Sequence, residues 1–213
     1  MNKINELFQL NENEFLEELK IISSSFDIFS FEKSISKSNF EKFFKKYSDL
    51  DSVTFFGGSF NPIHLGHLEC IKLCPEKNIL MVLDRNPQKD LRNLDLKNEL
   101  QLIVNRLQNL NVSLYPGFWL KSEKNPTNVW IQKVMAQEKN LLMGDDSFIN
   151  FFSWQKPEVI LMNLKKIYVV PRNHQLHQLM IVKEQCEQIN PQIEVVFLSN
   201  HLYQHLSSTE LRK

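Results

Sequence analysis

The segment VTFFGGSFNPIHLGHL, residues 53–68, places strong limits on the fold of this 213-residue chain. Its first four residues are β-branched or aromatic and predict a short strand, and a helical pattern begins near His64. Three of the five glycines, Gly57, Gly58 and Gly66, lie within this segment. Glycine has no Cβ, so the backbone there can approach a ligand closely or adopt a positive φ. Because the free N–H groups of a helix N-terminus would face this loop, the segment predicts a phosphate site.

Two histidines add chemistry to the loop. His64 and His67 are three residues apart, so their rings would lie on one face of the first helical turn. Imidazole can donate hydrogen bonds to phosphate oxygens, and its proton count can follow the local charge. A pair at this spacing also occurs as ordinary capping or surface residues. The preceding GGSFNP sequence favours the phosphate site.

Composition argues against several classes of protein. Lys and Arg number 25 and balance 25 Asp and Glu, so no overall basic field favours nucleic acid as a partner. No apolar run approaches membrane-spanning length, and the acidic N-terminus does not resemble a signal peptide. The three cysteines form no paired framework, which is typical of a reducing compartment. We therefore expect a cytoplasmic protein that binds neither nucleic acid nor membrane.

Two regions of different pattern divide the chain. Residues 1–50 carry apolar residues at helical spacing, including an aromatic stripe over 40–47, and predict a helical N-terminal extension. Residues 51–213 alternate short apolar strands with helical segments, which predicts an α/β domain with a doubly wound parallel sheet. The expected strands are Val53–Phe56, Ile79–Leu83, Val112–Tyr115, Leu141–Met143, Lys166–Val170 and Glu194–Leu198. The expected helices are His64–Cys74, Leu94–Leu110, Thr127–Gln137, Ser147–Phe152 with Glu158–Leu164, and His174–Ile189.

A second candidate phosphate site lies near the end of the chain, in the sequence HLSSTELR. Ser207, Ser208 and Thr209 would place three hydroxyl groups at a helix start, and Arg212 adds a planar, permanently charged donor. Glu210 follows Ser207 by three residues as in a capping box, so an ordinary capped helix also fits this pattern. In doubly wound sheets, ligands bind beyond the carboxyl ends of the strands, where such polar segments gather.

A third segment, MGDDSFINFFSW, follows the fourth expected strand. Asp145 and Asp146 would stabilise a helix N-terminus through its dipole, and Trp154 is equally consistent with core packing. Lys89, in the loop sequence RNPQK, would by itself be a solvated surface charge. These residues acquire a more specific interpretation only beside the other two motifs.

Together the three segments resemble the bacterial nicotinate-mononucleotide adenylyltransferases, which belong to the nucleotidyltransferase superfamily with a paired-histidine HxGH motif. GGSFNPIHLGHL resembles the first family signature, HLSSTELR resembles the second, ISSTxIR, and MGDDSFINFFSW resembles a third conserved region. Lys89 is similar in position to the lysine of a substrate loop like RPPHK. The resemblance covers roughly residues 51–213 and implies a Rossmann-like nucleotidyltransferase fold.

This resemblance implies an enzyme of NAD biosynthesis. It would transfer AMP from ATP to nicotinate or nicotinamide mononucleotide and release pyrophosphate. The expected partners are thus ATP and a pyridine mononucleotide, and a homo-oligomer is left open. The expected cofactor is Mg²⁺ held mostly by phosphates and water, without a metal site made of protein ligands. The implied catalytic residues are His64, His67 and Arg212; those for ATP binding are Gly57, Gly58, Ser59, Phe60, Gly66, Ser207, Ser208 and Thr209; those for the mononucleotide are Lys89, Gly144, Asp146 and Trp154.

Two departures from the family pattern leave the acceptor open. The segment resembling YTIDTL reads NVWIQKV here, with Val129 where a threonine is expected, and Gln155 stands where the family often has an aromatic residue. One alternative is therefore another HxGH enzyme with a phosphopantetheine or cytidylyl-type acceptor. The other is a catalytically inactive, nucleotide-binding regulatory module.

The C-terminal helix usual in the family has no counterpart, since the sequence ends one residue after Arg212. A single helical turn is not stable alone. We hypothesise that the extension of residues 1–50 packs near this end and supports it.

Overall fold

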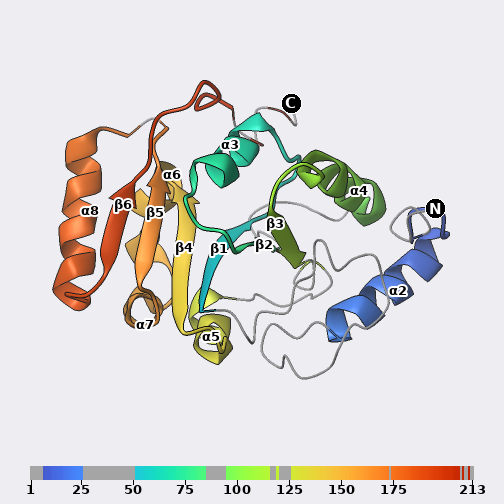
Figure 1. Ribbon diagram of the computed structural model, residues 1–213, viewed down its shortest axis with the longest axis horizontal. Helices are drawn as coiled ribbons and strands as arrows, with labels where there is room; N and C mark the ends of the chain where they lie inside the picture. The colour runs from blue at the N-terminus through green and yellow to red at the C-terminus, as the bar shows by residue number, and fades with distance from the viewer. Residues whose placement is uncertain are drawn as a thin grey trace.

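The computed structural model describes residues 7–25, 51–84, 95–115, 119, 126–172, 174–206, 208 and 211. Six parallel strands form one sheet in the order β3-β2-β1-β4-β5-β6 (Figure 1). This is the doubly wound α/β fold expected from the sequence. The strands are β1 Ser52–Gly58, β2 Ile79–Leu83, β3 Val112–Tyr115, β4 Glu138–Gly144, β5 Lys166–Val170 and β6 Glu194–Phe197.

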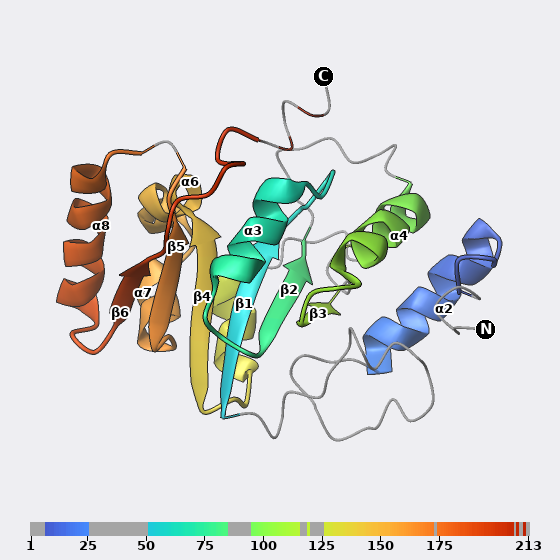
Figure 2. The same cartoon turned by 45° about the horizontal axis from the view of Figure 1, so that its top comes forward.

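Helices cover the sheet on both sides. Figure 2 shows α3 and α4 in front of the sheet, whereas α5 and α7 lie behind it. Helix α7 contacts both α5 and α8. Among the described residues, no helix is both long and apolar enough to cross a membrane. The helices are α2 Glu12–Ser25, α3 Leu65–Leu73, α4 Leu96–Leu107, α5 Thr127–Trp130, α6 Asp145–Ile149, α7 Pro157–Met162 and α8 Leu176–Ile189, with short 3₁₀ turns η3 Ile131–Lys133 and η4 Phe151–Ser153.

The strand order reverses between β1 and β4, which lie side by side at the centre of the sheet. Strand β1 continues through both glycines, because Gly57 pairs with Val82 and Gly58 with Leu83 of β2. The sequence analysis ended this strand at Phe56, so the glycines form the end of the strand and do not break it. The carboxyl ends of β1 and β4 meet at the reversal, which is where doubly wound sheets bind ligands.

The region between β3 and β4 differs most from the expected elements. The predicted helix Thr127–Gln137 ends at Lys133, and β4 begins at Glu138, three residues before the expected start. Lys139 and Asn140 look like loop residues in sequence, but both belong to β4 and form hydrogen bonds with other parts of the fold. The Lys139 ammonium group donates to the Ile131 carbonyl at the start of η3 (3.1 Å). Buried Asn140 donates to the hydroxyls of Ser52 (3.2 Å) and Thr54 on β1 (3.4 Å), so its polar side chain is satisfied within the sheet.

The described part of the N-terminal extension forms α2, which lies beside α4 in Figures 1 and 2. Lys97 at the start of α4 donates to the carbonyl of Leu10, just before α2. Phe15 and Leu19 are fully buried and belong to the same hydrophobic core as the sheet. Both views place α2 away from the segment 198–206. The other residues of the extension, 1–6 and 26–50, and most of the C-terminal end lie outside the described residues, so the hypothesis that the extension supports that end stays a prediction. The aromatic stripe over 40–47 lies outside the described residues.

Replacing Phe15 with alanine should lower the free energy of unfolding by about 3–5 kcal/mol, since a buried ring is removed and a cavity remains. The measurement is chemical denaturation followed by circular dichroism. Glu18→Ala on the exposed face of the same helix is the matched control and should change stability by less than about 0.5 kcal/mol. Equal stability of the two variants would show that α2 does not belong to the cooperative core. Because α2 shares one hydrophobic core with the α/β domain, the core does not mark a boundary at residue 50. The division of the chain there stays a proposal.

Candidate active site

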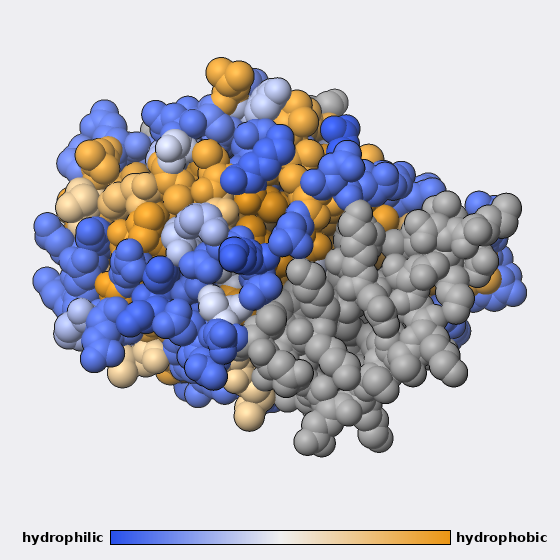
Figure 3. Space-filling model, in the orientation of Figure 1, coloured by the Kyte–Doolittle hydropathy of each residue, from blue (hydrophilic) through white to orange (hydrophobic). Residues whose placement is uncertain are grey.

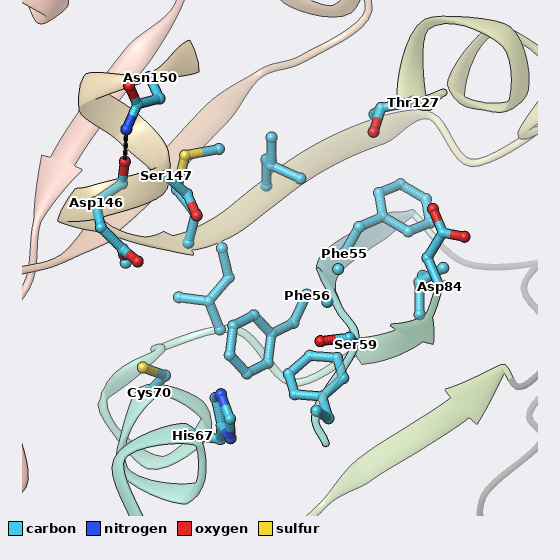
Figure 4. Close-up of a pocket in the computed structure, with 18 of the residues that line it drawn as sticks. Phe55, Phe56, Ser59, His67, Cys70, Asp84, Thr127, Asp146, Ser147 and Asn150 are labelled. Atoms are coloured by element: carbon cyan, nitrogen blue, oxygen red, sulfur yellow. Dashed lines mark hydrogen bonds between the residues drawn. The ribbon is translucent and has the colours of Figure 1, made fainter. Parts of the chain in front are cut away.

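A cavity of about 940 Å³ opens beyond the carboxyl ends of β1, β2 and β4, and its volume suits a substrate of nucleotide size. Figure 4 shows labelled side chains reaching it from several elements, with His67 and Cys70 on α3 and Asp146, Ser147 and Asn150 on α6. In the space-filling view, apolar side chains gather where Figure 1 places α3 and α6, with polar ones around them (Figure 3). The predicted site residues that line the cavity are Gly57, Gly58, Ser59, Phe60, His64, Gly66, His67, Gly144, Asp146, Trp154 and Ser208.

Four predicted residues, Lys89, Ser207, Thr209 and Arg212, lie outside the described residues. The first and second motifs nevertheless meet through Ser208. Its hydroxyl group donates to the carbonyl of Pro62 in the loop after β1 (3.1 Å). The two segments are 146 residues apart in the chain and lie together at one cavity. This proximity is the arrangement that a split phosphate site requires.

The loop after β1 uses its glycines for close approach. Nothing lies within 4 Å of the position that a Cβ on Gly57 would occupy, so a ligand can come directly against this backbone. A Cβ on Gly58 would lie 3.0 Å from the Phe60 ring, which therefore needs the space that glycine leaves. None of the described glycines has a positive φ; that conformation falls on Phe60, with φ of 44°. Gly57 thus lets a ligand approach the backbone, and Gly58 makes room for the Phe60 ring. Neither glycine adopts the positive φ that the sequence would permit.

The two histidines stack against each other with ring centroids 3.7 Å apart. His64 caps α3, and its backbone N–H donates to Nδ1 of His67 (3.3 Å). Since Nδ1 of His67 accepts a hydrogen bond, the neutral ring carries its proton on Nε2. The His67 ring also makes an edge contact with Phe60, with centroids 5.0 Å apart. Packing and hydrogen bonding therefore fix both the orientation and the tautomer of His67.

His64 is neutral at physiological pH. Burial lowers its pKa to about 4, and the positive charge of Arg172 and the nearby His201 add to this effect. Its Nδ1 is buried without a hydrogen-bond partner among the described residues. The ring can therefore serve as a neutral hydrogen-bonding group toward a ligand, and it carries no positive charge in the free protein.

The lowered pKa of His64 predicts a pH-dependent stability. An unfolded histidine has a pKa near 6.5, so between about pH 6.5 and 4 the unfolded chain binds more protons than the folded one. Stability should be fully present above pH 6.5 and fall as the pH drops toward 4. His201, whose pKa is also lowered, acts in the same direction. Melting temperatures of His64→Gln across this range should vary less than those of the wild type, whereas exposed His177→Gln should follow the wild type.

Gly66 stands between the histidines because two groups approach it. A Cβ at this position would lie 3.1 Å from the His64 ring and 3.1 Å from the carbonyl oxygen of Tyr203. The segment after β6 therefore packs directly on the first turn of α3. This contact explains in steric terms why glycine occupies the third position of the HxGH pattern.

Arg172 is a cavity residue to which the sequence analysis gave no role. It lies two residues after the end of β5, and its guanidinium group lies 3.5 Å from the Asp146 carboxylate. Nε donates to the carbonyl of Gln204 (3.2 Å) and Nη2 to that of Leu206. Arg172 therefore links the third motif to the segment that carries Ser208. The only signal in the sequence was its place in the loop that follows an expected strand.

The two adjacent aspartates of the third motif have different surroundings. Asp145 is fully buried and accepts the backbone N–H groups of Arg172 (2.7 Å) and His174 (2.9 Å), so it holds the loop after β5. Asp146 is more exposed and faces Arg172. A Cβ on Gly144 would lie 2.6 Å from the Asp146 carboxylate, so any side chain there would have to displace this carboxylate. Both aspartates also lie in the first turn of α6, as expected for helix N-terminal acids.

The far side of the cavity carries aromatic and polar groups. Trp154 packs against Phe151, with ring centroids 5.4 Å apart, and also lines the cavity. Thr127 and Trp130 line it too, whereas Val129 is 46% exposed and does not. Thr127, two residues before Val129, therefore brings a hydroxyl-bearing residue to the cavity lining.

Two further groups of the cavity bear on its chemistry. Asp84, directly after β2, contributes a carboxylate to the cavity, and its backbone N–H donates to the carbonyl of Gly58 (3.0 Å). Burial raises the pKa of the Cys70 thiol to about 12, so Cys70 is protonated and is a poor nucleophile. Within the described ranges, no group of three or more His, Cys, Asp or Glu could hold a metal ion.

Comparisons with known proteins find similar sequences and a related structure. A family model described as cytidylyltransferase-like matches residues 55–213. A probable nicotinate-nucleotide adenylyltransferase from Aquifex aeolicus is 28% identical over 73% of this chain and 98% of its own. Another from Christiangramia forsetii is 31% identical over 56% of this chain and 67% of its own. A solved structure, a putative nicotinate-nucleotide adenylyltransferase from Vibrio parahaemolyticus, is 19% identical, with a TM-score of 0.47 over 63% of this chain and 80% of that chain.

Proposed function

Because the chain belongs to the cytidylyltransferase-like family of nucleotidyltransferases, we propose that it transfers AMP from ATP to nicotinate or nicotinamide mononucleotide, with release of pyrophosphate. The observation that carries the proposal is the meeting of two distant motifs at one cavity, through the hydrogen bond of Ser208 with Pro62. The names of the relatives supply the reaction and the acceptor class.

The reaction needs positioning and charge stabilisation more than proton transfer. The 5′-phosphate of the mononucleotide is already ionised near neutrality, since its second pKa is about 6, so no general base is required. One of its oxygens attacks the α-phosphorus of ATP in line. A new P–O bond forms, and the bond between the α-phosphorus and the bridging oxygen breaks, leaving pyrophosphate. Hydrogen-bond donors aimed at the phosphate oxygens should provide most of the catalysis.

The described residues divide this work between two sides of the cavity. We assign the proton-bearing Nε2 of His67 to the α-phosphate and His64 to the outer phosphates and the transition state. The backbone at Gly57 would hold the triphosphate, together with Ser207, Ser208, Thr209 and Arg212. The Ser208 hydroxyl would exchange its hydrogen bond to the Pro62 carbonyl for one to a phosphate oxygen. Mg²⁺ fits this donor set if phosphates and water supply most of its ligands, and it would neutralise charge on the outer phosphates.

The acceptor side is assigned to groups across the cavity. Trp154 would stack on the pyridine ring, and Asp146 would bind ribose hydroxyls, with Gly144 giving the ligand access and Lys89 contacting its phosphate. Arg172 adds a cation to the described part of the site, next to Asp146. The buried, unpaired thiols of Cys70, Cys74 and Cys186 suit a cytoplasmic enzyme.

Pyrophosphate release from ATP and from CTP, measured with a panel of acceptors, tests the proposal. The panel contains nicotinate mononucleotide, nicotinamide mononucleotide, phosphopantetheine and glycerol phosphate, and His67→Asn serves as the blank. Release with ATP and a pyridine mononucleotide is the expected result. Release only with another acceptor would assign the chain to a different nucleotidyltransferase. ATP binding without release from any acceptor would indicate a binding module.

A further inference from the structure

His201 lies in the segment between β6 and the second motif and lines the same cavity as His64 and Arg172. Its Nδ1 accepts the backbone N–H of Tyr203 (3.2 Å). Its Nε2 is buried and has no hydrogen-bond partner among the described residues. Because Nδ1 acts as an acceptor, the neutral ring carries its proton on Nε2. The ring therefore holds a buried N–H donor at the cavity without an acceptor in the free protein.

The segment that carries His201 is anchored on both sides of the cavity. The Tyr203 carbonyl packs against Gly66 on α3, and Arg172 binds the carbonyls of Gln204 and Leu206. The ring is thus held near His64, with which it interacts electrostatically. Burial and Arg172 lower its pKa, opposed by Glu69, so it carries no charge near neutrality. A buried donor without a partner is uncommon in proteins and calls for an explanation.

We propose that the Nε2–H of His201 donates a hydrogen bond to the pyrophosphate part of ATP, as a third imidazole of the phosphate site. The inference rests on the proposed function for the identity of the nucleotide. The β/γ end is favoured because the same segment leads directly to Ser208, beside the loop after β1. A phosphate oxygen would supply the missing acceptor, and a neutral donor there adds to the charge of Arg172.

Two substitutions separate the donor from the local turn. His201→Asn keeps an oxygen that can accept the Tyr203 N–H, as asparagine does in Asx turns, but removes the donor at the Nε2 position. His201→Gln extends an amide N–H₂ toward that position and holds the turn less well. His205→Asn changes an exposed histidine of the same turn and is the matched control.

Calorimetric titration with inorganic pyrophosphate and with ATP, with melting temperatures recorded in parallel, tests the proposal. His201→Asn should weaken binding of both at least about tenfold with an unchanged melting temperature. His201→Gln should stay within about threefold of the wild type, and His205→Asn should match it. Wild-type affinity in His201→Asn would overturn the proposal. Equal losses in His201→Asn and His201→Gln would assign His201 to the fold of the turn and would also overturn it.

The two proposals fail in different ways. If pyrophosphate binding depends on His201 while no acceptor yields turnover, the adenylyl transfer proposal fails and the phosphate contact stands. If His201→Asn turns over a pyridine mononucleotide normally and binds pyrophosphate and ATP with unchanged affinity, the proposed contact of His201 is wrong. The adenylyl transfer proposal then stands.

Discussion

Replacing Arg172 with glutamine should lower kcat/KM for ATP by on the order of a thousandfold, the effect typical of a cation that stabilises phosphoryl transfer. The change removes a charge from the cavity, where the only other charged groups among the described lining residues are the carboxylates of Asp84 and Asp146. It also removes the donors that bind the carbonyls of Gln204 and Leu206. The segment that carries Ser208 then loses an anchor, so ATP binding and turnover should decline together. Steady-state kinetics with ATP varied at saturating mononucleotide measures the effect.

A loss of folding must be separated from a loss of phosphate binding. Arg172→Lys keeps the charge but cannot bind two carbonyls with one planar group, so it should retain part of the affinity and lose the anchor. Lys165→Gln removes an exposed cation just before β5 and should leave both activity and melting temperature unchanged. Activity of Arg172→Gln within tenfold of the wild type would show that Arg172 does not contact the reacting phosphates.

The sheet could be predicted from sequence because its strands are nearly continuous apolar runs buried on both faces; all five residues of β2 are buried. β4 was assigned too short because Lys139 and Asn140 are satisfied by partners distant in sequence, at Ile131 and on β1. A pattern of adjacent residues cannot show such partners.

The site residues also divide into those that the sequence indicates by motif and those that only the fold brings together. Glycines and histidines at fixed spacing mark a phosphate loop by their residue types, so these positions could be proposed from sequence. Arg172, His201 and Asp84 stand in no motif, and they belong to the site only because the order of the strands brings their loops together. Val129 stands where the family resemblance places a threonine, but it does not line the cavity, whereas Thr127 does, and only the fold shows this.

The second large effect is expected at His67, where asparagine should reduce kcat by about a hundredfold to a thousandfold with little change in KM. The structure favours asparagine over alanine for this test. Nδ1 of His67 accepts the backbone N–H of His64, and an asparagine oxygen can take over this bond at the start of α3. Alanine would remove that bond together with the ring contacts to His64 and Phe60.

His67→Asn therefore deletes the proton-bearing Nε2 while keeping the helix cap, so a fall in kcat reports the donor itself. Single-turnover measurement of pyrophosphate formation separates the chemical step from product release. His67→Gln, whose amide N–H₂ can reach toward the Nε2 position, should recover part of the lost rate. If His67→Asn turns over within tenfold of the wild type, the α-phosphate contact is wrong, and the stacked ring of His67 serves only to hold His64 in place. Loss of kcat without loss of ATP affinity would instead place the contact in the transition state, where a neutral donor aimed at the growing charge has its largest effect.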